Sequence, residues 1–163
     1  MKLNVTVNGE PKEFDIHPKD MLLDILREEG YTGVKRGCST GDCGACACIV
    51  DGKAVNTCIL FAAQVQGAAI TTVEGIGNPK APSPVQKEMT EAGGIQCGFC
   101  VPGIVVSATA LIDENPEPTE DEIREALDGN LCRCTGYVKQ IEAISRAVKE
   151  TRKTRGTRAA RIA

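Results

Sequence analysis

The placement of cysteine constrains this chain more than any other feature of its sequence. The 163 residues include nine cysteines, and eight of them fall into two groups. The first group is Cys38, Cys43, Cys46 and Cys58, and the second is Cys97, Cys100, Cys132 and Cys134. An apolar core does not need thiols at such spacings, and in a reducing compartment grouped cysteines are more often metal ligands than disulfides. We therefore expect two sites of four thiolates each.

The rest of the composition sets the class of protein. We expect a cytoplasmic protein without a membrane span, because the N-terminus shows no apolar signal segment and no apolar run approaches the ~18 residues that a span needs. Aromatic residues make up only 3% and Trp is absent, which favours two small domains stapled by metal over one large core. The net charge of −3, with few aromatics, argues against a nucleic-acid reader.

The first cysteine group has a specific spacing. It reads C-x4-C-x2-C, followed by a fourth cysteine after eleven residues, which is typical of a plant-type 2Fe–2S site. The glycines of the loop around Cys38–Cys46 allow the chain to wrap around a cluster. A structural zinc site is the alternative, although zinc sites more often use C-x2-C pairs. The ninth cysteine, Cys48, is expected to be a buried free thiol, with a ligand exchange with Cys46 as the alternative.

The N-terminal part has the pattern of a small α+β unit. Asn8-Gly9 and Asp51-Gly52 are typical of two-residue hairpin turns. The expected elements are a strand through Leu3, Val5 and Val7, a returning strand at 13–17, a helix capped by Asp20 and ended by Gly30, strands at 48–50 and 54–56, and a last strand at 70–73.

Beyond a Pro- and Gly-rich segment the pattern becomes helical. Helices are expected from Ser83 or Pro84 to about 93, at 101–112, from the capping box of Thr119 and Glu122 to Gly129, and at about 137–150. Four short helices favour a bundle. The predicted organisation is a ferredoxin-like domain at 1–76, a linker at 77–84, a helical domain at 85–150 and a basic tail at 151–163, which is either a disordered end or a docking arm.

The second cysteine group is ambiguous from its spacing alone. It combines a C-x2-C with a C-x-C, both near expected helix starts, where free amides and the helix dipole favour thiolates. Zinc and an iron–sulfur cluster suit such a set about equally well. His17, the only histidine, lies between a strand and a turn and is expected at the surface rather than among the ligands.

The residues around the second group resemble a known family. The strings C-G-F-C-x-P-G at Cys97–Gly103 and G-N-L-C-R-C-T-G-Y at Gly129–Tyr137 are similar to those of the iron–sulfur subunits of molybdenum hydroxylases, the group of xanthine dehydrogenase, aldehyde oxidoreductase and carbon monoxide dehydrogenase. The loop G-C-S-x-G-x-C-G-A-C at Gly37–Cys46 matches the other signature of that family. The resemblance covers residues 1 to about 150.

This resemblance implies a fold and a function. It implies an α+β chain with an N-terminal β-grasp ferredoxin-like domain and an all-α four-helix-bundle domain, each holding one 2Fe–2S cluster on its four cysteines. Such a chain is the non-catalytic electron-transfer subunit of a molybdenum-containing oxidoreductase. Electrons pass from molybdopterin in a large partner subunit through the helical domain and then the ferredoxin-like domain to FAD, in a medium subunit, or to another acceptor.

The resemblance also implies partner contacts and leaves alternatives. It implies a hetero-oligomer, a dimer of heterotrimers being one form, in which Gln96 and Cys134 contact the pterin. Gln96 can instead be a plain helix cap. No catalytic residue is expected in this chain. The competing functions are a free-standing ferredoxin, against which the helical half argues, and a zinc-stapled interaction module.

Overall fold

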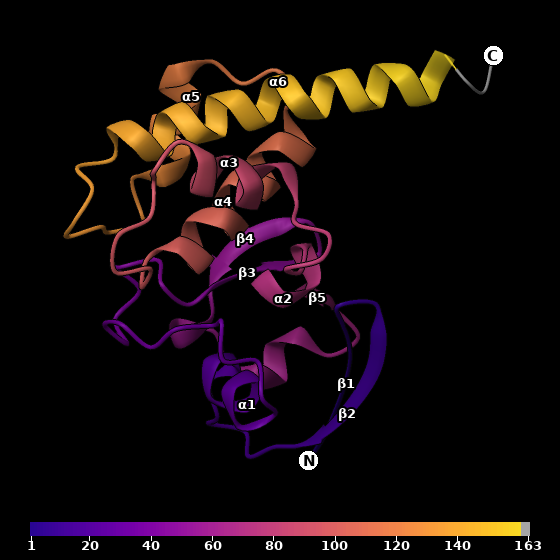
Figure 1. The fold of residues 1–163 in the computed structure, drawn as a ribbon. Coiled ribbons are helices and arrows are strands. Elements are labelled where there is room, and N and C mark those ends of the chain that lie inside the picture. The colour runs from indigo at the N-terminus through magenta and orange to yellow at the C-terminus, as the bar shows by residue number, and fades with distance from the viewer. Residues whose placement is uncertain (161–163) are drawn as a thin grey trace.

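A computed structural model describes the backbone of residues 1–160 and the side chains of residues 1–153. Figure 1 shows a lower part built on a sheet and an upper part built of helices, with the longest helix, α6, lying across the top. The fold is α+β, with the sheet domain first and the helical domain second, as predicted. In the described part of the chain, no helix combines the length and the apolar character that crossing a membrane requires.

The N-terminal half is a mixed sheet that grasps one helix. The sheet has the order β2-β1-β5-β3-β4, in which β1 pairs with β5 in parallel and the other neighbours are antiparallel. Its strands are β1 (Lys2–Val7), β2 (Glu10–Asp15), β3 (Ala47–Val50), β4 (Lys53–Asn56) and β5 (Ala69–Thr71). Helix α1 (Leu22–Glu28) and the short 3₁₀ helices η1 (Thr57–Ile59) and η2 (Ala62–Val65) complete this half.

Both predicted hairpin turns are present. Asn8 and Gly9 have φ values of 52° and 84°, and Asp51 and Gly52 have values of 48° and 85°, which is the left-handed pair that a two-residue turn requires. The predicted returning strand, β2, is present, but it runs from Glu10 to Asp15 rather than over 13–17. The tight turn lets pairing begin at once, with Val7 opposite Glu10, and a proline is tolerated because β2 is an edge strand.

The start of α1 also differs from the prediction. The N-cap residue is Met21, and it makes no side-chain capping bond. The Asp20 carboxylate instead accepts a 2.6 Å hydrogen bond from the His17 backbone amide. The backbone amide of Leu22 finds its partner in the carbonyl of Leu60, so a distant segment takes over part of the role that a cap would have.

The helical half contains the four predicted helices and one more. The helices are α2 (Val73–Ile76), α3 (Pro84–Glu91), α4 (Val101–Glu114), α5 (Glu120–Leu127) and α6 (Val138–Ala160). Capping boxes of Ser83 with Gln86 and of Thr119 with Glu122 start α3 and α5. The one-turn helix α2 was not predicted, and it shortens the last strand, which ends at Thr71 rather than at residue 73.

Helix α6 does not end at Glu150, as the sequence suggested. It continues to Ala160, and Figure 1 shows it extending past the other helices. No helix breaker stands between Glu150 and Gly156, and Arg152 forms a 3.0 Å ion pair with Glu117 before α5. The sequence left the basic tail as either a disordered end or a docking arm, and the structure gives the backbone of 151–160 as a continuation of α6. Residues 161–163 lie outside the described part of the chain.

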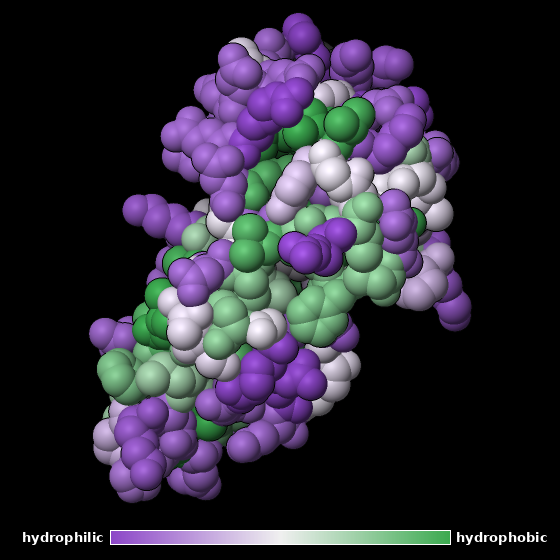
Figure 2. Space-filling view, turned by 90° about the vertical axis from the view of Figure 1, so that its left-hand side faces the viewer, coloured by the Kyte–Doolittle hydropathy of each residue, from purple (hydrophilic) through white to green (hydrophobic). Residues whose placement is uncertain are grey.

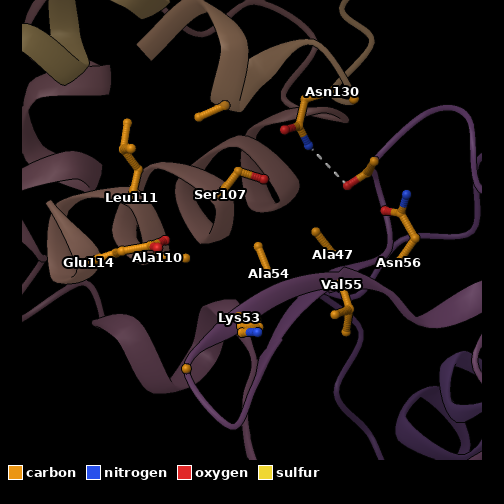
Figure 3. A pocket seen from close by; sticks show the side chains of 14 residues that line it. Ala47, Lys53, Ala54, Val55, Asn56, Ser107, Ala110, Leu111, Glu114 and Asn130 are labelled. Carbon is orange, nitrogen blue, oxygen red and sulfur yellow. Dashed lines mark hydrogen bonds between the residues drawn. The ribbon is translucent and has the colours of Figure 1, made fainter. Parts of the chain in front are cut away.

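The two halves pack directly against each other. Ala47 and Ile49 of β3 form a small buried cluster with Val106 and Ala110 of α4. Because two of these side chains are alanines, the helix lies close on the strand. Between the β3–β4 hairpin and α4 there remains a cavity of about 490 Å³, shown in Figure 3. The position of the helical half is thus set by the packing of α4 on β3.

Candidate metal centres

The first cysteine group is brought together by a loop and a 3₁₀ turn. Cys38, Cys43 and Cys46 lie on the loop between α1 and β3, and Cys58 lies in η1. The thiols form two hydrogen-bonded pairs, Cys38 with Cys43 and Cys46 with Cys58. The charge of Cys38 also acts on Cys58, so the two pairs are neighbours. All four predicted residues of this group thus converge in one place.

Hydrogen bonds and burial differentiate the thiols of this group. Hydrogen bonds from the Thr40 hydroxyl and from its backbone amide, 3.4 Å from Cys38 Sγ, lower the pKa of Cys38 to about 5. Burial raises the pKa of Cys43 and raises that of Cys58 to about 11. The group therefore offers one ready thiolate, and metal binding must displace protons from the buried members.

The second cysteine group joins the start of α4 to the loop between α5 and α6. Cys97 and Cys100 precede α4, and Cys132 and Cys134 lie before α6. These thiols also pair two and two, Cys97 with Cys134 and Cys100 with Cys132, and the charge of Cys132 acts on Cys134. Cys100 is buried, whereas Cys97 and Cys134 are exposed. The group therefore has an inner pair, Cys100 with Cys132, and an exposed outer pair, Cys97 with Cys134.

Donors surround the inner pair of the second group. Burial by itself would raise the pKa of Cys132, but hydrogen bonds with the Thr135 hydroxyl at 3.1 Å and from its amide at 3.4 Å outweigh it and lower the pKa to about 7. For Cys100, burial dominates and raises the pKa to about 11. The Cys132 amide donates a 2.8 Å hydrogen bond to the Tyr137 hydroxyl, which holds the loop in place.

Gln140 is a further polar neighbour of this group that sequence reasoning missed. Its side chain is fully buried at the start of α6, and its amide nitrogen lies 3.5 Å from Cys100 Sγ and 3.6 Å from Cys132 Sγ. A signal for it was present in the sequence. Gln140 shares one helix face with Ile144 and Ala147, which are buried apolar residues, so it is a polar residue on an apolar stripe.

A short hydrogen-bonded bridge connects the two groups. The Leu131 backbone amide, next to Cys132, donates a 3.0 Å hydrogen bond to the carbonyl of Cys43. Beside it, the buried Asn130 side chain donates to the Gly44 carbonyl at 3.2 Å, which is the dashed line in Figure 3. Sequence reasoning missed this bridge, because its partners lie 86 residues apart.

Glycines make this close approach possible. A Cβ atom on Gly103 would lie 2.2 Å from the Gly44 carbonyl oxygen, and one on Gly44 would lie 2.2 Å from the Gly129 carbonyl oxygen. Real Cβ atoms essentially never come so close to backbone atoms. The backbone of the first cysteine loop therefore rests directly on the backbone around the second group.

The residues fit 2Fe–2S clusters. A two-iron cluster takes two thiolates on each iron, and both groups present two pairs of thiols. A structural zinc ion instead needs four donors around one point rather than two pairs. The backbone and side-chain donors aimed at the sulfurs suit an anionic cluster.

Three further residues were singled out in the sequence, namely Gln96, His17 and Cys48. Gln96 is exposed beside Cys97, and it does not cap α4, whose N-cap residue is Cys100. His17 is exposed, as expected of a surface residue. Cys48 is fully buried on β3 within the apolar core, and burial raises the pKa of its thiol, which suits a free protonated cysteine.

Comparisons with known protein families agree with this geometry. Residues 5–70 match the 2Fe-2S iron-sulfur cluster binding domain, and residues 72–145 match the [2Fe-2S] binding domain. These two matches contain the first and the second cysteine group respectively.

Known proteins resemble nearly the whole chain. The chain is 47% identical to the nicotinate dehydrogenase small FeS subunit of Eubacterium barkeri, over 90% of this chain and 94% of that protein. It is 41% identical to the xanthine dehydrogenase iron-sulfur-binding subunit of Escherichia coli O157:H7, over 87% and 91%.

Solved structures show the same fold. A chain of quinoline 2-oxidoreductase from Pseudomonas putida 86 matches with a TM-score of 0.89 and 40% identity, over 94% of this chain and 96% of that one. Aldehyde oxidoreductase from Desulfovibrio gigas matches with a TM-score of 0.92 and 41% identity, but the match covers only 17% of that longer chain.

Proposed function

This chain belongs to the small iron–sulfur subunits of the molybdenum hydroxylase family, and from this we propose how its residues serve an electron-transfer role in a multi-subunit oxidoreductase. We assign the ligands of one 2Fe–2S cluster to Cys38, Cys43, Cys46 and Cys58, and those of the other to Cys97, Cys100, Cys132 and Cys134. Such clusters supply one-electron redox chemistry when bound. No residue of this chain is assigned a role in substrate chemistry.

The bridge between the two cysteine groups carries the proposal. Electron transfer weakens steeply with distance, so a chain that relays electrons needs its two redox sites close together. The Leu131–Cys43 hydrogen bond links a residue adjacent to one proposed ligand with another proposed ligand. A free-standing ferredoxin needs only the first site, and an interaction module needs no such link.

Exposed apolar residues beside each site support the proposal that partner subunits bind there. Phe99, Leu131 and Val138, beside the second cysteine group, are 48%, 57% and 70% exposed. Figure 2, which views the molecule from the side of the cysteine loops, shows hydrophobic residues gathered across the middle of this face between hydrophilic ends. Apolar surface of this kind is typical of an interface. We assign the surface around Phe99, Leu131 and Val138 to the large molybdopterin-binding subunit.

The first site has an exposed apolar neighbourhood of its own. Ile59, next to Cys58, is 57% exposed, and Phe61 is 42% exposed. We assign this side to the electron acceptor, FAD in a medium subunit, so that electrons enter at the second cysteine group and leave at the first. A heterotrimer results, and a dimer of heterotrimers is the assembly we propose. The cytoplasmic location stays a prediction from the N-terminal sequence, which shows no apolar signal segment.

The substrate does not follow from this chain. Its relatives are named for different substrates, namely nicotinate, nicotine, xanthine and aldehydes, and all of them resemble this chain to a similar extent. The choice of substrate therefore belongs to the partner subunit.

Affinity purification of the tagged chain from its native host tests the proposal. The expected product is a red-brown complex several times larger than this chain that contains iron, acid-labile sulfide, molybdenum and FAD. A brown protein of 17.3 kDa without molybdenum would favour the free-standing ferredoxin. A colourless protein that contains zinc would favour the interaction module.

Replacing Gln96 by alanine tests the proposed pterin contact. Gln96 is exposed next to Cys97 and is not the N-cap residue of α4. The iron content of the variant should therefore stay unchanged. Turnover of the assembled enzyme should fall by about tenfold or more, as is common when groups around a metal centre are removed. Nicotinate and xanthine are the first substrates to try. The exposed Gln66, whose side-chain oxygen accepts a hydrogen bond from the Asn4 amide of β1, gives the control Gln66→Ala. Equal turnover of the two variants would remove Gln96 from the electron path.

A further inference from the structure

The Gln140 side chain is held with its nitrogen toward the second cysteine group. The nitrogen donates to the Gly94 carbonyl at 3.3 Å and lies within hydrogen-bond reach of Cys100 Sγ and Cys132 Sγ. A flipped amide would place an acceptor oxygen against the carbonyl and the two sulfurs, which offer no proton once they are deprotonated. The orientation is therefore fixed by the surrounding acceptors.

The other end of the same amide has no partner. Gln140 Oε1 is buried and makes no hydrogen bond, and a buried acceptor without a partner costs stability. An apolar residue at this position of α6 would avoid that cost, because the neighbouring Ala143 and Ile144 are fully buried in an apolar cluster. A glutamine is therefore unfavourable for the helix packing and is useful only through its nitrogen.

We propose that Gln140 is a positioning residue that sets the reduction potential of the cluster held by the second cysteine group. The assignment rests on the ligands proposed above. Reduction adds one electron and no proton, so the reduced site is more negative by one charge, and an N–H donor stabilises it more than it stabilises the oxidised site. Because Gln140 is 0% exposed, water does not screen this interaction. Gln140 therefore raises the potential and makes the site a better electron acceptor.

The first cysteine group shows the opposite arrangement of a side-chain amide. Asn56 directs its oxygen toward Cys46, whose thiol lies 3.9 Å away, while its nitrogen donates to the Gly41 carbonyl at 2.7 Å. An acceptor oxygen near a sulfur does not stabilise added negative charge. The donor effect of a buried side-chain amide is thus expected at the second site and not at the first.

Redox titration of the full chain, reconstituted anaerobically with iron and sulfide, tests the proposal. In Gln140→Met, which keeps the length of the side chain but removes the donor, one of the two potentials should become more negative. We expect at least a tenfold change in the ratio of oxidised to reduced protein at a fixed potential, about 59 mV for a one-electron couple. The other potential should not move. The control Gln66→Met changes a glutamine whose oxygen accepts from the Asn4 amide, and it should leave both potentials unchanged.

The outcomes separate this inference from the function on which it rests. Two clusters with unshifted potentials in Gln140→Met would overturn the role of Gln140 and leave the electron-transfer function intact. A wild-type chain that binds no iron and sulfide would instead overturn the ligand assignment.

A second measurement covers the case in which Gln140→Met does not fold. The Gln96→Ala chain, labelled with ¹⁵N in its glutamine side chains, should show nitrogen hyperfine coupling in the pulsed EPR signal of one cluster only. Gln96 directly precedes Cys97 in the sequence. Its removal ensures that a coupling does not come from this glutamine. Absence of the coupling from both cluster signals would overturn the proposal.

Discussion

Replacing Gly103 by alanine is expected to force the two halves of the chain apart at the bridge between the cysteine groups. Gly103 lies in the first turn of α4, and its new Cβ would stand 2.2 Å from the Gly44 carbonyl oxygen. The obstacle is backbone, which cannot turn away as a side chain can. Alanine favours a helix by about 1 kcal/mol over glycine, but overpacking typically costs ~1–3 kcal/mol, and a backbone obstacle places this site at the upper end.

The measurements are chemical unfolding and the EPR spin–spin interaction between the two reduced clusters. We expect a lower free energy of unfolding together with a weaker interaction, since the Leu131–Cys43 hydrogen bond must lengthen. Gly129→Ala is the matched control, because Gly129 lies at the same contact but has open space at its Cβ position. If Gly103→Ala and Gly129→Ala behave alike, the contact between the two backbones is looser than the structure has it.

Replacing Cys58 by serine is expected to remove one cluster and to leave the other. Cys58 closes the first group from η1 and pairs with Cys46, so its loss leaves one iron with a single thiolate. About half of the iron and acid-labile sulfide should disappear, with one of the two EPR signals. All four proposed ligands of the second group lie in the helical half, so its cluster should persist. Electron delivery to the acceptor should stop in the assembled enzyme.

The ninth cysteine provides the matched control for this variant. Cys48 is buried like Cys58 but lies deeper, on β3 in the apolar core, so Cys48→Ala should keep all the iron and lose only a modest amount of stability. Loss of iron from Cys48→Ala would mean that Cys48, and not Cys46, is the ligand. Loss of both clusters from Cys58→Ser would mean that the two halves do not fold independently.

Local chemistry was readable in the sequence wherever neighbouring residues decide the structure. The turn at Asn8-Gly9 and the capping box of Thr119 with Glu122 were predicted and are present, because each depends on residues within a few positions. The start of α1 was not, because the hydrogen bond of Leu22 to Leu60 comes from a distant segment. Spacing likewise identified both cysteine groups as sets.

The spacing of the cysteines did not predict that the two groups lie against each other. The Asn130–Gly44 hydrogen bond joins residues from the two halves, and it depends on how α4 packs on β3. Gln140 likewise reaches the cysteines only because α6 turns that face inward beside the start of α4. Such contacts follow from tertiary packing, which no local pattern records. The end of α6 was missed for a different reason, since the basic residues after Glu150 were set apart as a tail although they include good helix formers.

The junction between the two halves also bears on how such subunits can be exchanged. Carbonyl and amide atoms of the main chain make the Leu131–Cys43 contact, so a substitution of the Leu131 side chain leaves that hydrogen bond intact. Surfaces facing different large subunits are then free to diverge while the internal separation stays constant. A chimaera that joins the sheet half of this chain, residues 1–71, to the helical half of a relative should therefore preserve that separation, provided that both glycines of the junction, Gly44 and Gly103, are kept.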